Sequence, residues 1–206
     1  MESHFDAAAR SWDTPDKVAR TERIAEAIAE VVPLDGASAL DYGCGTGLLT
    51  WELAGRLGHV TLADVSTGML EVARERAASD PGRFTVVRHD LTHAPLPHPV
   101  DLAYSAMALH HIPDTHAVLA NLTASVRPGG WVALADLDAD PDNHFHDDDF
   151  TGHRGIDRHA LAADLAALGY TEVAERTVDR LVKTKNGVDH EHGVFLVTGR
   201  RPADIA

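Results

Sequence analysis

A glycine-rich stretch limits most strongly what this chain can fold into. The apolar run Ala37–Leu40 predicts a buried strand that ends in Asp41. Three glycines then follow at alternate positions: Gly43, Gly45 and Gly47. Apolar residues at helical spacing follow over 48–54, and we expect a helix over about 47–57. A strand, a tight glycine turn and a helix form the first unit of a nucleotide-binding α/β sheet, in which the helix directs its N-terminal N–H groups at the ligand.

The spacing of the glycines distinguishes between possible ligands. A dinucleotide site requires G-x-G-x-x-G, and Leu48 stands where its third glycine would be. Asp41 would repel a pyrophosphate but suits an ammonium group, such as the one that S-adenosylmethionine carries. The segment ALDYGCGTG resembles motif I of the class I S-adenosylmethionine-dependent methyltransferases. The resemblance implies that Asp41, Gly43, Cys44 and Gly45 bind this cofactor, with Cys44 as a small residue in a crowded loop.

Two further acids predict the adenosine end of the site. Asp64 ends an expected strand over 59–64, where a carboxylate can accept both ribose hydroxyls. DVSTGMLEVAR resembles the family segment after this strand, which places Val65 and Met69 at the cofactor. The resemblance implies that Met69 packs on the adenine; a methionine of the hydrophobic core is the alternative. By the same resemblance Asp90, after a strand over 83–90, accepts from the adenine amino group and the Leu91 N–H meets a ring nitrogen.

An expected strand over 100–105 leads into a segment with two adjacent histidines. By resemblance to the family, backbone carbonyls near Ser105 hold the ammonium group, and His110 and His111 lie within reach of the pocket. A histidine could take a proton from the acceptor, with His110 ahead of His111. A structural role for the pair is the alternative.

Composition favours a small-molecule substrate. The chain of 206 residues has 32 acids against 18 bases and a formal charge of -14, which disfavours nucleic acid and membrane surfaces. No apolar run is long enough to span a membrane, and the N-terminus does not resemble a signal peptide. The single cysteine, Cys44, excludes an internal disulfide and agrees with the cytoplasm. We expect a monomer or a homodimer.

We expect one domain over 1–206. The fold class is α/β: a Rossmann-like, doubly wound seven-stranded sheet with a C-terminal antiparallel β-hairpin, in the order 3-2-1-4-5-7-6 by analogy with the family. Its predicted parts are N-terminal cap helices (1–32), a cofactor-binding core (36–136), a lid-like loop (137–156), and a C-terminal helix and hairpin (157–200). A turn over 126–130 is expected before a strand over 131–136, and a polar loop over 183–192 between strands over 170–182 and 193–200. FDAAARSWD resembles the segment that leads into ubiquinone-biosynthesis-type methyltransferases, which implies that Trp12 and Arg20 line or close the site. Packing of Trp12 between the helix and the domain is the alternative.

The segment 138–157 is rich in histidine and aspartate. His144, His146 and His153 lie near acids and could ligate a metal, but methyl transfer from a sulfonium needs none, and we expect no metal. We interpret the segment as a lid in which Phe145 and Phe150 form an apolar wall over the acceptor.

These features predict an enzyme that transfers a methyl group from S-adenosylmethionine to a small molecule and releases S-adenosylhomocysteine. Two alternatives remain. A non-catalytic S-adenosylmethionine-binding or scaffold protein would share the same glycines and acids. A nicotinamide-dependent dehydrogenase would share Asp64 and the glycine turn, although Leu48, Asp41 and the C-terminal hairpin disfavour it.

Overall fold

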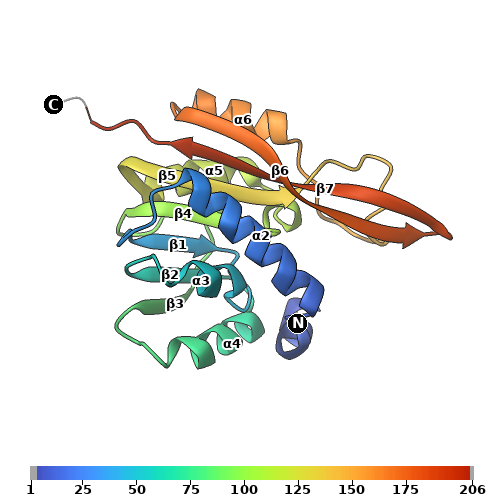
Figure 1. Ribbon diagram of the computed structural model, residues 1–206, viewed down its shortest axis with the longest axis horizontal. Helices are drawn as coiled ribbons and strands as arrows, with labels where there is room; N and C mark the ends of the chain where they lie inside the picture. Colours follow the sequence, from blue (N-terminus) through green and yellow to red (C-terminus); the bar gives the residue numbers. More distant parts are fainter. Residues whose placement is uncertain (1–3, 205–206) are drawn as a thin grey trace.

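The computed structural model describes residues 4–204, in which strands and helices alternate along the chain (Figure 1). In chain order the elements are α1 His4–Ala8, the 3-10 helix η1 Ala9–Ser11, α2 Pro15–Val31, β1 Ala39–Tyr42, α3 Leu48–Leu53, β2 Val60–Asp64, α4 Thr67–Ala77, β3 Phe84–Arg88, β4 Val100–Ala106, the 3-10 helix η2 Leu109–His111, α5 Thr115–Ser125, β5 Val126–Leu137, α6 Arg158–Ala167, β6 Thr171–Lys185 and β7 Val188–Arg200. No helix between residues 4 and 204 is both long and apolar enough to cross a membrane.

The seven strands form one sheet in the order β3-β2-β1-β4-β5-β7-β6. Neighbouring strands from β3 to β5 run parallel, while β7 is antiparallel to both β5 and β6. Both the predicted fold class and the predicted strand order are confirmed. The order reverses between β1 and β4, which creates a crevice at the carboxyl ends of these strands.

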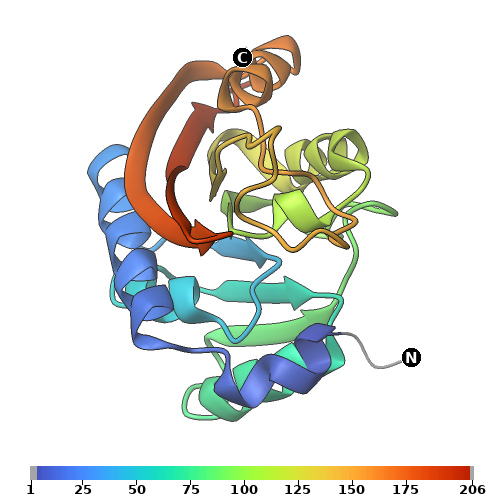
Figure 2. The same cartoon turned by 90° about the vertical axis from the view of Figure 1, so that its right-hand side faces the viewer.

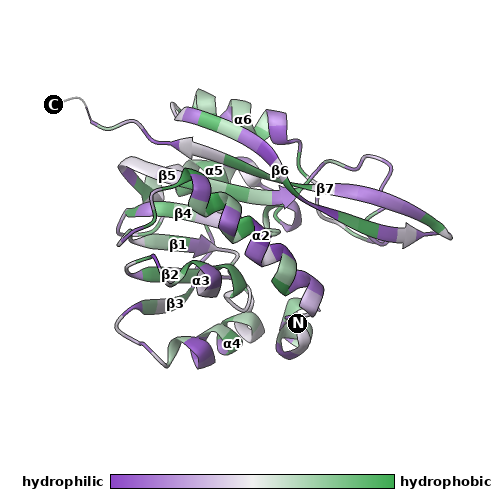
Figure 3. Ribbon diagram, in the orientation of Figure 1, coloured by the Kyte–Doolittle hydropathy of each residue, from purple (hydrophilic) through white to green (hydrophobic). Residues whose placement is uncertain are grey.

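Helices cover both faces of the sheet, and the alternation of side chains along each strand divides the core in two. In β1, Ala39 packs with α2, α3 and α4 on one face, while Leu40 packs with α5 and α6 on the other. Both residues are fully buried. Hydrophobic residues are correspondingly dense along β4 and β5 (Figure 3). Because the central strands β1 and β4 are covered on both faces, they show short apolar runs rather than clean alternation.

The C-terminal hairpin is longer than the sequence indicated. The expected polar loop over 183–192 is wrong, because β6 and β7 stay paired up to Lys185 and Val188. Asn186 and Gly187 form the turn, and both have positive φ, of 54° and 77°. An Asn-Gly pair in this conformation closes a two-residue turn whose twist matches the flanking strands. The hairpin therefore projects beyond the carboxyl edge of the other strands (Figure 1).

Two other boundaries differ from the prediction. The turn expected over 126–130 is part of β5, since Val126 pairs with Val100 and the register shifts before Trp131. Gly129, at a φ of 81°, accommodates this irregularity. The helix α3 ends at Leu53, earlier than the expected 57. Helix α2 begins with Pro15 in its first turn, where a missing N–H is tolerated.

Candidate active site

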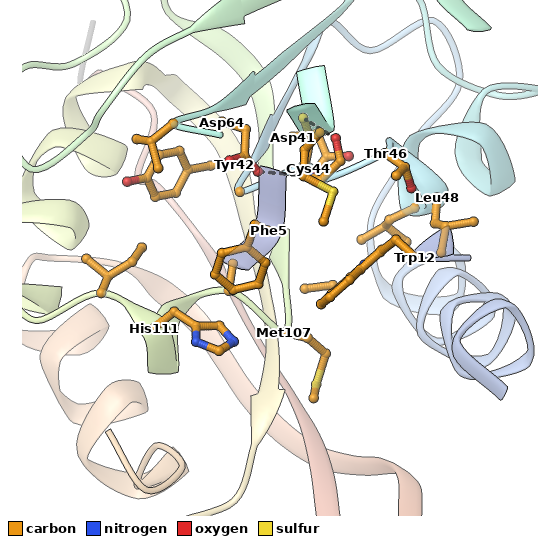
Figure 4. A pocket seen from close by; sticks show the side chains of 18 of the residues that line it. Phe5, Trp12, Asp41, Tyr42, Cys44, Thr46, Leu48, Asp64, Met107 and His111 are labelled. Atoms are coloured by element: carbon orange, nitrogen blue, oxygen red, sulfur yellow. Dashed lines mark hydrogen bonds between the residues drawn. The ribbon is translucent and has the colours of Figure 1, made fainter. Parts of the chain in front are cut away.

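A cavity of about 390 Å³ lies at the carboxyl ends of the strands, on the crevice where the strand order reverses. The loops after β1, β2, β3 and β4 form its floor, and α2 with the segment before it forms the opposite wall. Figure 4 shows Asp41, Cys44 and Asp64 on one side, with Phe5, Trp12, Met107 and His111 on the other. Ligands bind at this place in open α/β sheets.

Gly43 shows why the loop after β1 requires glycine. Its φ is 67°, a region that is costly for other residues. A Cβ atom placed on Gly43 would lie 2.5 Å from the Cβ of Ala108. The loop therefore approaches the segment after β4 closely, and this contact brings the two sides of the cavity together.

Asp41 is a buried carboxylate with an internal hydrogen-bond partner. The Thr50 hydroxyl donates to Asp41 Oδ2 at 2.7 Å, and the Tyr104 hydroxyl lies 2.8 Å from Thr50 Oγ1. Burial raises the pKa of Asp41 to about 7, although the hydrogen bond from Thr50 acts in the opposite direction. A cationic ligand beside Asp41 would relieve this cost by stabilising its charged form.

Asp64 organises the loop around itself. Its carboxylate accepts from the backbone N–H of Gly45 at 2.8 Å and of Ser66 at 2.9 Å. Burial nevertheless raises the pKa of Asp64. Ser66 caps α4 by accepting from the Met69 N–H, and Met69 reaches the cavity wall while only 2% exposed. One acid thus fixes the positions of the glycine loop and the start of α4.

Asp90, two residues after the end of β3, also lines the cavity. Burial would raise the pKa of Asp90, but hydrogen bonds from the Thr92 hydroxyl and N–H outweigh it and lower the pKa. The neighbouring Leu91 is fully buried and does not line the cavity, while the Asn121 side chain donates to its carbonyl.

The segment before α2 covers the cavity. Phe5 and Trp12 line it, and their rings meet edge to face at 5.6 Å. Asp6 fastens the segment to the start of α4, because its carboxylate accepts from the Ser66 hydroxyl and the Gly68 N–H. Figure 2 shows α1 beside α4. Trp12 and Arg20 both lie in the wall, as the sequence indicated.

Asp13 also attaches the covering segment to the rest of the protein. It accepts a hydrogen bond from the Thr46 hydroxyl at 2.6 Å and forms an ion pair with Arg76. Thr46 belongs to the glycine loop, so the covering segment and the loop hold each other in place.

The two adjacent histidines have different surroundings. His111 lines the cavity, and burial, with the charge of His110 as the next cause, lowers the pKa of His111 to about 4. His110 is 3% exposed and does not line the cavity. Its Nδ1 lies 2.5 Å from Asp136 Oδ1, and its backbone N–H donates to the same carboxylate. The structure thus places His111, and not His110, in the cavity wall, although we ranked His110 ahead of His111 as the candidate base.

Met107, between β4 and these histidines, has a φ of 56° and lines the cavity. A non-glycine residue in this conformation stores about 1–3 kcal/mol of strain, which surrounding contacts must hold. The Met107 N–H donates to Ala135 O at 2.9 Å. The strained residue therefore sits where β4 turns into the wall of the cavity.

The structure brings together most of the residues that the sequence pointed to. Those in the cavity wall are Asp41, Gly43, Cys44, Gly45, Asp64, Val65, Met69, Asp90 and His111. Ser105 is fully buried behind the wall, like Leu91, and within residues 4–204 its hydroxyl has no hydrogen-bond partner.

The three histidines of the 138–157 segment do not converge. The ring of His144 stacks on His190 at 3.8 Å, that of His146 stacks on Phe150 at 3.7 Å, and His153 Nε2 lies 3.0 Å from the carbonyl of Ile112. No group of three or more His, Cys, Asp or Glu side chains within residues 4–204 is arranged to hold a metal ion.

Phe145 and Phe150, from which we expected an apolar wall over the acceptor, do not line this cavity. Phe150 meets His111 edge to face at 5.4 Å.

Sequence reasoning missed Asp136, Lys17 and Lys185. Lys17 lines the cavity beside Arg20. Lys185, near the hairpin tip, donates to the carbonyls of Asn143 and His146 and pairs with Asp148 Oδ1 at 2.7 Å. No local pattern marks Asp136 and Lys185, because their partners are tens of residues away. Lys17 carried a weak signal, since it shares a helical face with Arg20.

Comparison with known proteins shows which class of protein the chain resembles. Residues 39–130 match the methyltransferase domain family. An uncharacterised methyltransferase of Mycobacterium bovis is 41% identical over 105 residues, covering 50% of this chain and 52% of that protein. The chain thus spans about half the length of the first curated relatives it matches.

Solved structures agree on the fold. The DhpI–SAH complex has a TM-score of 0.71 at 22% identity and covers 98% of this chain and 95% of that one. The [4+2]-cyclase SpnF has a TM-score of 0.67 at 20% identity, covering 88% and 81%. The arrangement of strands and helices, with its crevice, is a Rossmann-like fold of the kind seen in these solved structures. Residues 39–130 match the methyltransferase domain family, and the chain is similar to proteins named as methyltransferases.

Proposed function

We propose that this protein transfers a methyl group from S-adenosylmethionine to a small-molecule acceptor and releases S-adenosylhomocysteine. One observation carries the proposal: Asp41, Asp64 and Asp90, at or just beyond the ends of three neighbouring strands, line one cavity together with the glycine loop. Their order follows the strand order β1, β2, β3. This spacing suits a ligand with an ammonium group at one end, a ribose in the middle and an adenine at the other.

The chemistry of each position supports this fit. Asp41 is buried and lacks a cationic partner within the part of the chain that the structure describes, which suits the ammonium group. Gly43 leaves a close approach that a Cβ would fill, and the orphaned Ser105 hydroxyl lies 3.9 Å from that Cβ position. Asp64 accepts the Gly45 N–H on one carboxylate oxygen and the Ser66 N–H on the other, and each oxygen has a second lone pair that suits a ribose hydroxyl. We infer that Met69 and Val65 border the adenosine.

When bound, S-adenosylmethionine supplies a methyl group that its sulfonium makes reactive. The protein supplies alignment and exclusion of water, which together can contribute roughly 7–11 kcal/mol in favourable cases. Phe5, Trp12 and Met107 provide apolar walls for this purpose. The low pKa of His111 keeps its imidazole neutral near pH 7, so it can accept a hydrogen bond from an acceptor hydroxyl or amine.

Calorimetry with S-adenosylhomocysteine and with NAD tests the cofactor. We expect micromolar or tighter binding of S-adenosylhomocysteine and none of NAD; the reverse pattern would refute the proposal. Asp64→Ala should weaken binding by about 10-fold or more, because hydrogen bonds to a charged group contribute roughly 1.5–3 kcal/mol each. Asp80→Ala, which removes an exposed acid from a turn, is the matched control and should leave affinity unchanged.

A non-catalytic role with the same cofactor is the second candidate. It remains because the fold alone does not define the reaction: one chain of similar fold is described as a [4+2]-cyclase. A panel of phenols, alcohols, amines, carboxylic acids and thiols separates the two. Release of S-adenosylhomocysteine with any acceptor supports methyl transfer, whereas tight cofactor binding without turnover across the panel supports the second candidate.

A further inference from the structure

Two positively charged side chains, Lys17 and Arg20, lie together in the cavity wall that α2 provides. They are three residues apart, so with Thr21 and Ile24 they share the helix face that lines the cavity. Arg20 is the more deeply buried of the two. The same wall holds no other lysine or arginine.

Neither cation has an acidic partner in contact. Within residues 4–204, Lys17 and Arg20 make no ion pair and donate no hydrogen bond to a carboxylate. Lys17 Nζ lies 3.2 Å from the centre of the Trp12 ring, which is a cation–π contact without an oxygen acceptor. The chain has 32 acids for 18 basic side chains, so partners are not scarce. Arg23, one turn further along α2, pairs with Asp179 at 2.8 Å.

Holding two such cations side by side is unfavourable without anions. Burial lowers the pKa of both side chains, and the charge of Arg20 lowers the pKa of Lys17 further. A buried charge is normally compensated by a partner, so this wall is suited to anionic ligands. The cofactor brings a single carboxylate. It also brings a sulfonium, which adds a positive charge to the same cavity.

We propose that Lys17 and Arg20 serve two different anions, one the carboxylate of the cofactor and the other an anionic group on the methyl acceptor. The acceptor is then a small molecule that carries a carboxylate or a phosphate-like group. This inference rests on the proposed function, because it assumes that the cofactor occupies the same cavity. The charges support this inference. The carboxylate of the cofactor neutralises one of the two cations, and the anionic group of the acceptor compensates the other cation, in a cavity that also holds the sulfonium.

The test uses the full chain and three single variants on α2. Lys17→Met and Arg20→Met each remove one charge while keeping an unbranched side chain, and Arg23→Met removes a cation that does not line the cavity. Calorimetry gives the affinity of each variant for S-adenosylhomocysteine. We expect one of the first two to bind roughly 10-fold or more weakly. The other, like Arg23→Met, should stay within about 2-fold of the wild type.

The second readout is the midpoint of thermal unfolding of protein saturated with S-adenosylhomocysteine. Sodium acetate and inorganic phosphate are added at constant ionic strength, with chloride as the reference. We expect at least one of them to raise the midpoint of the wild type, because an anion that binds the folded state stabilises it. The increase should persist in Arg23→Met and disappear in the variant that kept its affinity for S-adenosylhomocysteine.

Three results would overturn the inference. Equal losses of affinity in Lys17→Met and Arg20→Met would show that both cations clamp the cofactor. No loss in either would show that neither meets its carboxylate. No stabilisation of the saturated wild type by either anion would leave the second cation without a ligand. Failure of the wild type to bind S-adenosylhomocysteine is a different outcome, which refutes the proposed function together with this inference.

Discussion

Replacing Gly43 with alanine measures how tightly the glycine loop is built into the cavity. Two separate costs are expected from the structure. The φ of 67° places an alanine in the left-handed region, at about 1–2 kcal/mol. The new Cβ would also lie 2.5 Å from the Cβ of Ala108, which cannot rotate away. Overpacking of this kind costs about 1–3 kcal/mol. Together they predict a loss of about 2–5 kcal/mol in the free energy of unfolding.

Gly36 provides a matched control for the first cost. Its φ is 73°, but a Cβ there would meet nothing within 4 Å. Gly36→Ala should therefore cost only about 1–2 kcal/mol. For a chain of this size these values correspond to decreases in the unfolding midpoint of roughly 2–8 °C for Gly36→Ala and 4–20 °C for Gly43→Ala.

Urea unfolding followed by circular dichroism, without ligand, gives both free energies. Calorimetry with S-adenosylhomocysteine adds a functional readout: Gly43→Ala should lose affinity and Gly36→Ala should retain it. The reasoning fails if the two variants unfold within about 0.5 kcal/mol of each other, since the contact with Ala108 would then carry no cost.

Three further predictions follow from buried or clamped side chains. Burial raises the pKa of Asp41 to about 7, so the folded state retains a proton that the unfolded state releases near pH 4. The free energy of unfolding should therefore fall as the pH rises from about 4 to 7. Urea titrations across this range should show a flatter dependence in Asp41→Asn, and an unchanged slope would contradict the assignment. His110→Ala leaves the buried carboxylate of Asp136 without its partner and should lower the free energy of unfolding by about 3–5 kcal/mol. His111→Ala should lower it less in the same urea titrations. Equal losses in the two variants would argue against a structural pair of His110 and Asp136. Lys185→Met removes three hydrogen bonds to residues 143–148 and should speed amide hydrogen exchange there, while unchanged exchange would show that the hairpin does not hold this segment.

Much of the fold was accessible from the sequence because its signals are local. Strand periodicity, the glycine turn and the caps at Ser66 and Asp157 each depend on a few adjacent residues. The hairpin turn at Asn186-Gly187 was visible too, but its composition suggested a loop. Pairing beyond the sheet depends on contacts between strands, which polar residues do not reveal.

The sequence by itself indicated the α/β fold class and, through its resemblance to a known family, the strand order and most of the side chains around the cavity. Motif spacing supported the position of the acids, because acids at the ends of parallel strands meet at one edge of the sheet. Only the tertiary structure decided which histidine lines the cavity. His110 and His111 are adjacent in η2 but point in different directions. Asp136, which is 26 residues from His110, holds the His110 ring in the interior. It also showed that Lys17 and Arg20 make no ion pair within residues 4–204, which can be seen only when the neighbouring segments are in place.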